Sequence, residues 1–316
     1  MHSYRRWIAA GMVTVMAVCL SAFGWNWKST QKTGSTSQNT EYSKSQNTEY
    51  TSQNKKYTPQ QMLENGMDKL KTAQSLHASL EMELEIKIFG FPMEAKASMD
   101  MVSFQSPYKL KTDVNLDLGL LGETQALNYA CQKDDSYLLY TKNKKGWNVE
   151  ETTASELYKY DGQRMMQTFL EQIEELTEQG TEKLQGRSTY KYTGVIRWEG
   201  LQKILLDTGL VDHLATVMQG SVLKSVGNVL GQQEQIKALM KKAEDLEVTL
   251  WIDEQTGYPL QCSMDVTEML SDAFGKLLQS SSDNTKKWSG FKLTGAEIVI
   301  QCGEYNQAQE FTMPVK

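Results

Sequence analysis

The feature that most limits how this chain can fold is a strict alternation of apolar and polar residues near its N-terminal third. Leu80, Met82, Leu84 and Ile86 alternate with polar side chains, and the same two-residue period returns at 93–101 and 108–118. This period is typical of strands that have one buried face and one solvated face. The short connections between these segments predict an antiparallel meander.

Other segments extend this pattern and add helices. Apolar residues recur with a period near 3.6 at Met165, Met166, Phe169, Leu170, Ile173 and Leu176, and this spacing predicts a helix; further helices are expected after the middle strand. Together they predict an α+β fold, in which one large antiparallel sheet carries helices packed on one face. Further strands are expected at 124–132, 136–142, 146–150, 189–198, 246–253, 258–267 and 291–302, and helices at 58–75, 162–179, 201–218 and 232–245.

The first 57 residues differ in composition from the rest. Residues 1–27 combine Arg5 and Arg6 with an uncharged apolar run, which indicates a signal peptide or an uncleaved membrane anchor. Residues 28–57 contain the hexamer SQNTEY twice and no aliphatic core, so they are expected to form a flexible linker. Residues 58–316 form the folded domain. We therefore expect an extracytoplasmic protein attached to the cell membrane.

Cys19 lies late in the apolar run, where bacterial lipoproteins carry a lipidated cysteine, although Val18 is larger than the usual preceding residue. The alternative is an ordinary cysteine in an apolar helix. Three cysteines remain, and Cys262 and Cys302 fall on the apolar faces of two consecutive expected strands. We expect them to form a disulfide; the alternative is a pair of buried thiols.

The chain has few residues suited to catalysis. Net charge is −6 and the sequence pI is about 5.3, which argues against nucleic acid as a partner. His77 and His213 stand alone, and no metal-ligand, nucleophile-elbow or phosphate-loop motif occurs in the sequence. We expect no enzymatic activity, no cofactor and no metal site, and a monomeric protein.

One hairpin segment resembles a known family. Residues 248–260 read VTLWIDEQTGYPL, which is similar to the "WID..TG.P" hairpin of LolA/LppX-like lipoproteins. The resemblance implies a strongly curved antiparallel sheet, a half-barrel, whose concave side is covered by helices that enclose an apolar cavity. It also implies a carrier of lipids or of lipoprotein acyl chains. The remainder of 58–316 shares the order of elements with this family, rather than its residues.

The apolar faces suggest where a ligand would bind. Methionine side chains adapt their shape to variable apolar ligands, although they also serve as ordinary core residues. If the half-barrel holds a lipid, its walls come from the strands and from the 162–179 helix. The alternative is an envelope interaction or sensor module with a filled core and no small-molecule ligand. The expected ligand-binding residues are Leu84, Ile86, Met99, Leu110, Val114, Met165, Met166, Phe169 and Ile173.

Two turns at one end of the expected meander are unusually apolar. Turns normally face water and are polar. Apolar tips beside lysines suit contact with a membrane surface that carries anionic headgroups. We therefore expect this rim to touch the membrane, through Phe89, Phe91, Leu120, Leu121, Lys144 and Lys145.

Overall fold

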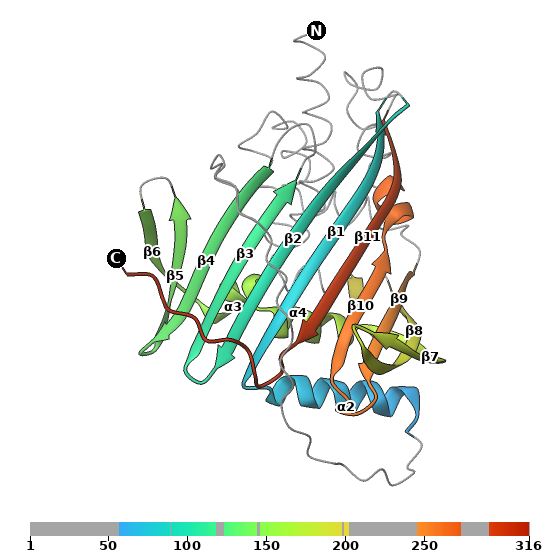
Figure 1. The fold of residues 1–316 in the computed structure, drawn as a ribbon, viewed down its shortest axis with the longest axis horizontal. Coiled ribbons are helices and arrows are strands. Elements are labelled where there is room, and N and C mark those ends of the chain that lie inside the picture. Colours follow the sequence, from blue (N-terminus) through green and yellow to red (C-terminus); the bar gives the residue numbers. More distant parts are fainter. Residues whose placement is uncertain are drawn as a thin grey trace.

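The computed structural model describes residues 57–88, 90–117, 123–143, 146–197, 199–201, 245–272 and 291–315. Its strands form one open antiparallel sheet of 11 strands in the order β6-β5-β4-β3-β2-β1-β11-β10-β9-β8-β7. Helices lie on one face of this sheet, and the opposite face is crossed by the C-terminal segment (Figure 1). The predicted α+β fold class, a curved half-barrel sheet with helices on its concave face, is confirmed.

The first six strands follow one another as the meander that the alternation predicts. Each strand pairs with the next in antiparallel register, so apolar positions on neighbouring strands meet on the same face, as Leu80 does with Met99 and Met99 with Val114. The strands are β1 (Ser75–Ile88), β2 (Phe91–Gln105), β3 (Tyr108–Asp117), β4 (Glu123–Lys133), β5 (Ser136–Asn143) and β6 (Gly146–Thr152).

The second half of the sheet joins the first through its last strand. β11 (Phe291–Gly303) lies between β1 and β10, so the end of the chain closes the contact between the two halves. The pairing of Leu80 with Ile300 keeps both apolar side chains on the inner face. The remaining strands are β7 (Ile173–Leu184), β8 (Arg187–Ile196), β9 (Leu246–Asp253) and β10 (Pro259–Asp265).

The first described helix, α2 (Pro59–Thr72), begins where the sequence predicts. Thr58 accepts a hydrogen bond from the Gln61 backbone N–H, and the Gln61 side chain accepts one from the Thr58 N–H, which completes a capping box. Figure 1 shows α2 across one end of the sheet, beside the ends of β11 and β10. Its buried residues include Leu63 and Leu70. The helix therefore covers one end of the half-barrel.

The segment 162–179 is not one helix, contrary to the prediction. Helix α4 (Gly162–Leu170) ends after nine residues, and β7 starts at Ile173. The apolar spacing continues past Leu170, but the chain pairs with β8 as a bulged edge strand, with positive φ at Glu175 and Gly180. Pairing with a neighbouring strand outweighs the local helical period here, as tertiary context commonly does.

A short helical stretch precedes α4. It consists of α3 (Ala154–Leu157) and the 3₁₀ turn η2 (Tyr158–Tyr160). Leu157 packs with Leu110, Ala130 and Leu139 in a second, smaller core cluster on the inner face of β3–β5. The two helices predicted at 201–218 and 232–245 lie outside the described residues, apart from Leu201 and Asp245. Among the described residues, no helix is long and apolar enough to cross a membrane.

Candidate functional site

The inner face of the sheet is a continuous apolar surface built by the two-residue period. Its central strands contribute small and flexible side chains, of which Ala95 and Ala97 are small and Met82, Met99 and Met101 are flexible. Every one of these residues is buried. Methionine combines apolar character with three rotatable bonds, so this surface can adapt to objects of different shape.

Helix α4 lies directly on this surface and adds more methionine. Its buried stripe holds Met165, Met166 and Phe169, which belong to the same cluster as the methionines of β1 and β2. The nine predicted ligand-binding residues are all at most 5% exposed. Eight of them form part of the main cluster, whereas Leu110 packs in the smaller one. Whether they contact a ligand stays a prediction.

The helix approaches the sheet most closely at its first residue. A Cβ atom at Gly162 would lie 2.4 Å from the Ala78 Cβ on β1, and 3.5 Å from the Met101 side chain on β2. Real Cβ atoms do not come this close to rigid neighbours. Glycine at 162 therefore sets the distance between α4 and the sheet.

Polar contacts hold the same end of α4 in place. The Gln163 side chain donates to the Leu70 carbonyl at 2.6 Å and accepts from Gln105 Nε2 at 2.7 Å. It thus ties α4 to the end of α2 and to β2. The Asp161 carboxylate accepts from the backbone N–H groups of Gln163 and Arg164, as an N-cap, and from the Tyr108 hydroxyl at 3.2 Å.

This N-cap gives a prediction for pH dependence. Burial raises the pKa of the Asp161 carboxyl above its ordinary value of 3.8, against the opposing hydrogen bonds from Arg164 and Tyr108. Such a carboxyl contributes fully to stability only below pH 3.8 and loses that contribution as the pH rises through the raised pKa. Asparagine stabilises a helix N-terminus about as much as aspartate does. Asp161→Asn should therefore gain stability relative to the native protein between pH 4 and pH 7.

Urea unfolding of both proteins at the two pH values measures this change. Asp265→Asn is the matched control, because Asp265 accepts from the Thr267 backbone N–H in the same way but is exposed. Its stability difference from the native protein should change much less with pH. If the difference in unfolding free energy between Asp161→Asn and the native protein is the same at pH 4 and pH 7, the pKa of Asp161 is not raised in the folded protein.

The rim residues are only partly described. Phe91 is 68% exposed at the start of β2, an unusual position for a large apolar side chain. The meander places the β1–β2, β3–β4 and β5–β6 connections at the end of the sheet opposite to α2 (Figure 1). Phe89, Leu120, Leu121, Lys144 and Lys145 lie outside the described residues, as does Cys19. The rim contact and the lipidation therefore stay predictions.

The predicted disulfide is not present. Cys262 and Cys302 are buried free thiols, and Cys131 is also free. The register explains why: Cys262 lies opposite Ile300, so Cys302 is its diagonal neighbour on the same face. Diagonal neighbours are separated by more than the roughly 4 Å between Cβ atoms that a disulfide requires. Burial raises the pKa of both thiols to about 12, which keeps them protonated.

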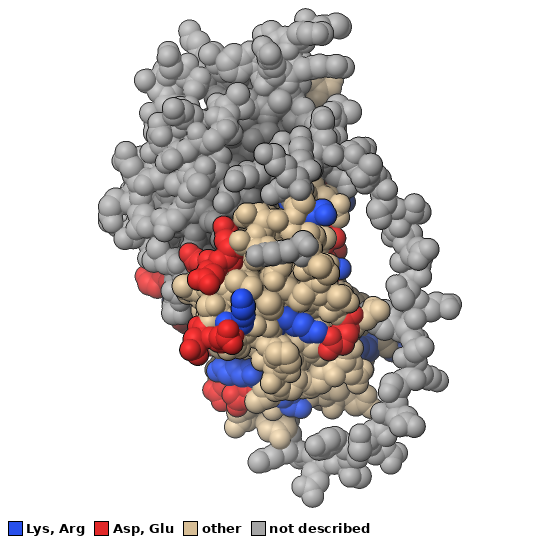
Figure 2. All heavy atoms as spheres, turned by 90° about the vertical axis from the view of Figure 1, so that its left-hand side faces the viewer, with Lys and Arg blue, Asp and Glu red and all other residues tan. Residues whose placement is uncertain are grey.

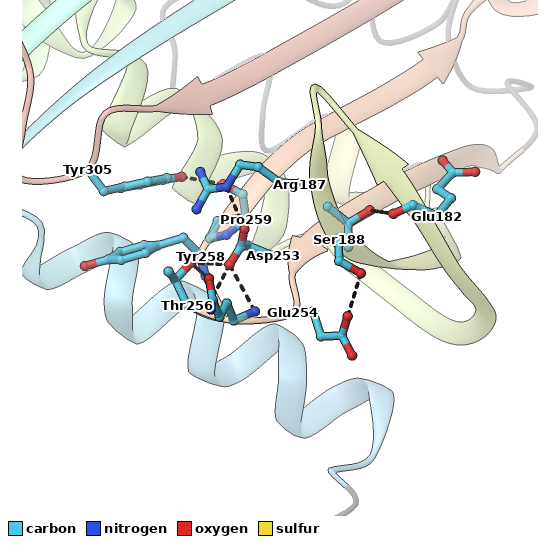
Figure 3. A network of polar contacts seen from close by, with 11 residues as sticks. Glu182, Arg187, Ser188, Asp253, Glu254, Thr256, Tyr258, Pro259 and Tyr305 are labelled. Carbon is cyan, nitrogen blue, oxygen red and sulfur yellow. Dashed lines mark hydrogen bonds and ion pairs between the residues drawn. The ribbon is translucent and has the colours of Figure 1, made fainter. Parts of the chain in front are cut away.

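The hairpin that carries the family resemblance is held by a network of hydrogen bonds around Asp253. The Asp253 Oδ1 atom accepts from the backbone N–H of Gln255 and from both the backbone N–H and the hydroxyl of Thr256. Its Oδ2 atom pairs with the Arg187 guanidinium at 2.7 Å. Gly257 takes a φ of +70°, which glycine adopts without strain. Figure 3 shows this network at the junction of β8, β9 and β10.

The same hairpin also contacts helix α2 and the C-terminal segment. The Tyr305 hydroxyl donates to the Pro259 carbonyl, and the Tyr305 ring stacks on Tyr258 with centroids 4.0 Å apart. Lys69 on α2 donates to the Thr256 carbonyl and lies over the Tyr258 ring. The motif thus holds the turn, helix α2 and the C-terminal segment together, while its apolar side chains Leu250 and Ile252 belong to the same core cluster as the inner methionines.

The isolated histidine is a surface group. His77 Nε2 lies 2.8 Å from Asp100 Oδ2 on the outer face of β1 and β2, and this hydrogen bond raises the His77 pKa. His213 lies outside the described residues. In the part of the chain that the structure describes, no group of three or more His, Cys, Asp or Glu residues could hold a metal ion. The expectation that the protein is not an enzyme stays a prediction.

Comparison with known proteins finds related structures rather than related sequences. No protein-family model matches the chain, and no curated protein matches its sequence. The solved structure of the lipoprotein LppX from Mycobacterium tuberculosis aligns with 16% identity over 79% of this chain and 95% of its own, with a TM-score of 0.42. LprF from Mycobacterium bovis aligns with 13% identity over 82% and 97%, with a TM-score of 0.43.

A further solved structure also aligns with this chain. A putative outer membrane lipoprotein-sorting protein domain from Vibrio parahaemolyticus aligns with 9% identity over 78% of this chain and 91% of its own, with a TM-score of 0.25. The chain is thus similar in fold to solved structures titled LppX, LprF and a lipoprotein-sorting domain.

Proposed function

We propose that this chain is an extracytoplasmic, membrane-attached carrier that binds a lipid, or another apolar ligand, between helix α4 and the inner face of the sheet. The observation that supports this most directly is the gathering of methionine on both sides of that contact. Met82, Met99 and Met101 come from the sheet and Met165 and Met166 from the helix. A surface of this kind accommodates variable apolar ligands without a fixed shape.

The N-terminal sequence supports the location. An apolar leader followed by a polar linker tethers residues 58–316 to the outer side of the membrane, where lipids are the accessible apolar ligands. The exposed Phe91 at the rim provides a place at which such a ligand would enter. The competing function is an interaction or sensor module. Its inner face would be filled by the side chains of the protein alone, and the burial of the inner-face residues agrees with this reading as well.

The test compares two neighbouring positions that point to opposite faces of β2. Ala97 lies on the inner face and is buried, whereas Ser98 lies on the outer face and is exposed. Ala97→Phe should reduce the lipid that co-purifies with the full chain at least about fivefold, because the added ring takes the space of the ligand. Ser98→Phe should leave the lipid unchanged. Native mass spectrometry of protein purified from membranes measures both.

The competing function predicts a different result. In a filled core, an added phenyl ring overpacks the interior and costs about 1–3 kcal/mol of stability. Native protein without co-purified lipid, together with an Ala97→Phe variant that is simply destabilised, would establish the sensor module and exclude the carrier.

A further inference from the structure

The open sheet has two edges, and they differ in how they are protected from pairing with another chain. At one edge, the register of β7 against β8 shifts twice, and the strand has positive φ at Glu175 and Gly180. Bulges of this kind are a usual means by which an edge strand avoids further pairing. At the other edge, all seven residues of β6 pair with β5 without a register shift. β6 also contains no lysine, arginine or proline, so a further strand can pair with its free side.

The outer face of the sheet beside this free edge is apolar. Tyr129, Tyr140 and Val149 lie opposite one another in a row across β4, β5 and β6, and all three are half-buried. The Trp147 ring meets the Tyr129 ring edge-on, with their centroids 5.5 Å apart. Because the row ends at Val149 on the edge, a strand added there would bury an apolar side chain against another.

The sequence of β6 is complementary to itself in one antiparallel register. When Val149 lies opposite Val149 of a second copy, all seven residues of β6 are paired, because Val149 is the middle one. Glu150 then faces the Asn148 amide, which donates hydrogen bonds to carboxylates. Glu151 faces Trp147, so no two carboxylates are opposed. A register centred on Glu150 or Glu151 would instead place like charges directly opposite, which is unfavourable.

The charges around the edge also suit a second copy. Lys142 on β5 lies opposite Trp147, and its ammonium is 4.8 Å from the centroid of that ring. In the register above, Lys142 stands in the same row as Glu151 of the second copy, and the two-fold symmetry repeats this arrangement. Figure 2 views the molecule from the β6 side and shows acidic and basic groups interspersed there. A second copy therefore meets no surface of a single charge that would repel it.

We propose that β6 is a dimerisation edge, at which two copies of this chain pair antiparallel about Val149 and continue one sheet into the other. This interaction is separate from the carrier function, so either can fail without the other. The sequence led us to expect a monomer, because the pattern within a strand does not show which strands lie at an edge. Only the order of the strands places Gly146–Thr152 there.

The expected dimer is weak in dilute solution. Pairing of seven residues buries less surface than the roughly 1,200 Å² of a stable interface. Copies that are held at one membrane have a high effective concentration, which favours pairing. This strengthening alone rests on the proposed membrane attachment, and the experiment therefore uses the full chain in membranes.

Cross-linking through Val149 tests the pairing. The full chain with Val149→Cys is treated in membranes with a short bis-maleimide, and mass spectrometry gives the amount of covalent dimer. We expect at least about ten times more dimer than for Thr181→Cys, because facing cysteines react at a high effective concentration. Thr181→Cys is the matched control, since it places an exposed cysteine on the β7 edge. The native chain controls for the free thiol of Cys131, which is partly buried.

An exchange of charges tests the register. Asn148→Glu places a carboxylate opposite Glu150 of the second copy, twice by symmetry, and should reduce the dimer of Val149→Cys about tenfold. Addition of Glu150→Lys makes the facing charges opposite and should restore the dimer to within about twofold of its original amount. Both positions are exposed, so the fold of one copy does not depend on either side chain.

The outcomes are distinct. A covalent dimer no more abundant than for Thr181→Cys or the native chain, or one that Asn148→Glu leaves unchanged, would overturn the proposal. A cross-linked product with the mass of this chain plus a different protein would assign the edge to another partner and overturn the pairing of two copies. A dimer that shows the expected loss and rescue supports the pairing, whether or not lipid co-purifies with the protein.

Discussion

Replacing Asp253 with alanine is expected to lower the free energy of unfolding by about 3 kcal/mol, since it removes three hydrogen bonds to a charged acceptor at a buried site. The two backbone N–H groups of Gln255 and Thr256 lose their acceptor, and Arg187 loses its partner. Because the Arg187 side chain is partly exposed, water replaces part of that interaction. The turn itself, rather than the ion pair, accounts for most of the expected loss.

The neighbouring residue provides the control. Glu254 lies in the same turn, is exposed, and accepts a hydrogen bond from the Ser188 hydroxyl. Glu254→Ala should cost no more than about 1 kcal/mol, because an exposed partner is replaced by water. Chemical unfolding of both variants gives the comparison. A loss for Asp253→Ala as small as that for Glu254→Ala would show that the hairpin does not depend on this carboxylate.

The second large effect is expected at Gly162. A methyl group there would lie 2.4 Å from the Ala78 Cβ, so Gly162→Ala must move α4 away from β1. Overpacking of this kind costs about 1–3 kcal/mol, which exceeds the helix propensity of about 1 kcal/mol that alanine gains over glycine. The net result should be a destabilised protein, measured by thermal or urea unfolding.

A double substitution tests whether the collision with Ala78 causes the loss of stability. Ala78→Gly removes the atom with which the new methyl group collides, so the pair Gly162→Ala and Ala78→Gly should be more stable than the sum of the single changes predicts, by about 1 kcal/mol or more. Gly303→Ala is the control, since nothing lies within 4 Å of a Cβ at that position. Additive effects of the two changes would contradict the close contact between α4 and β1.

Much of the sheet could be predicted from the sequence because alternation is a local signal. The inner positions of β1, β2 and β3 follow directly from the two-residue period, and the structure buries most of the described ones, such as Leu80, Met99 and Val114. The capping box at Thr58 likewise fixed the start of α2, since its partners are three residues apart. These features require no knowledge of distant parts of the chain.

The candidate site was only half predictable for the same reason. The methionine faces appear in the alternation, and the nine expected ligand-binding residues all prove to be buried. The buried polar residues Thr112 and Asn128 lie opposite each other on β3 and β4, and the alternation does not reveal that they meet, because strand register alone brings them together.

The sequence by itself determined the strand faces, the start of α2 and the glycine turn after Asp253, all of which depend on neighbouring residues. Tertiary structure decided three further features. Pairing with β8 made 173–184 a strand although its apolar period is helical. The register placed Cys262 opposite Ile300, so the two thiols stay free. The insertion of β11 between β1 and β10 joined the two halves of the sheet. Each depends on which strand lies beside which, and that choice is set by the burial of the whole inner face.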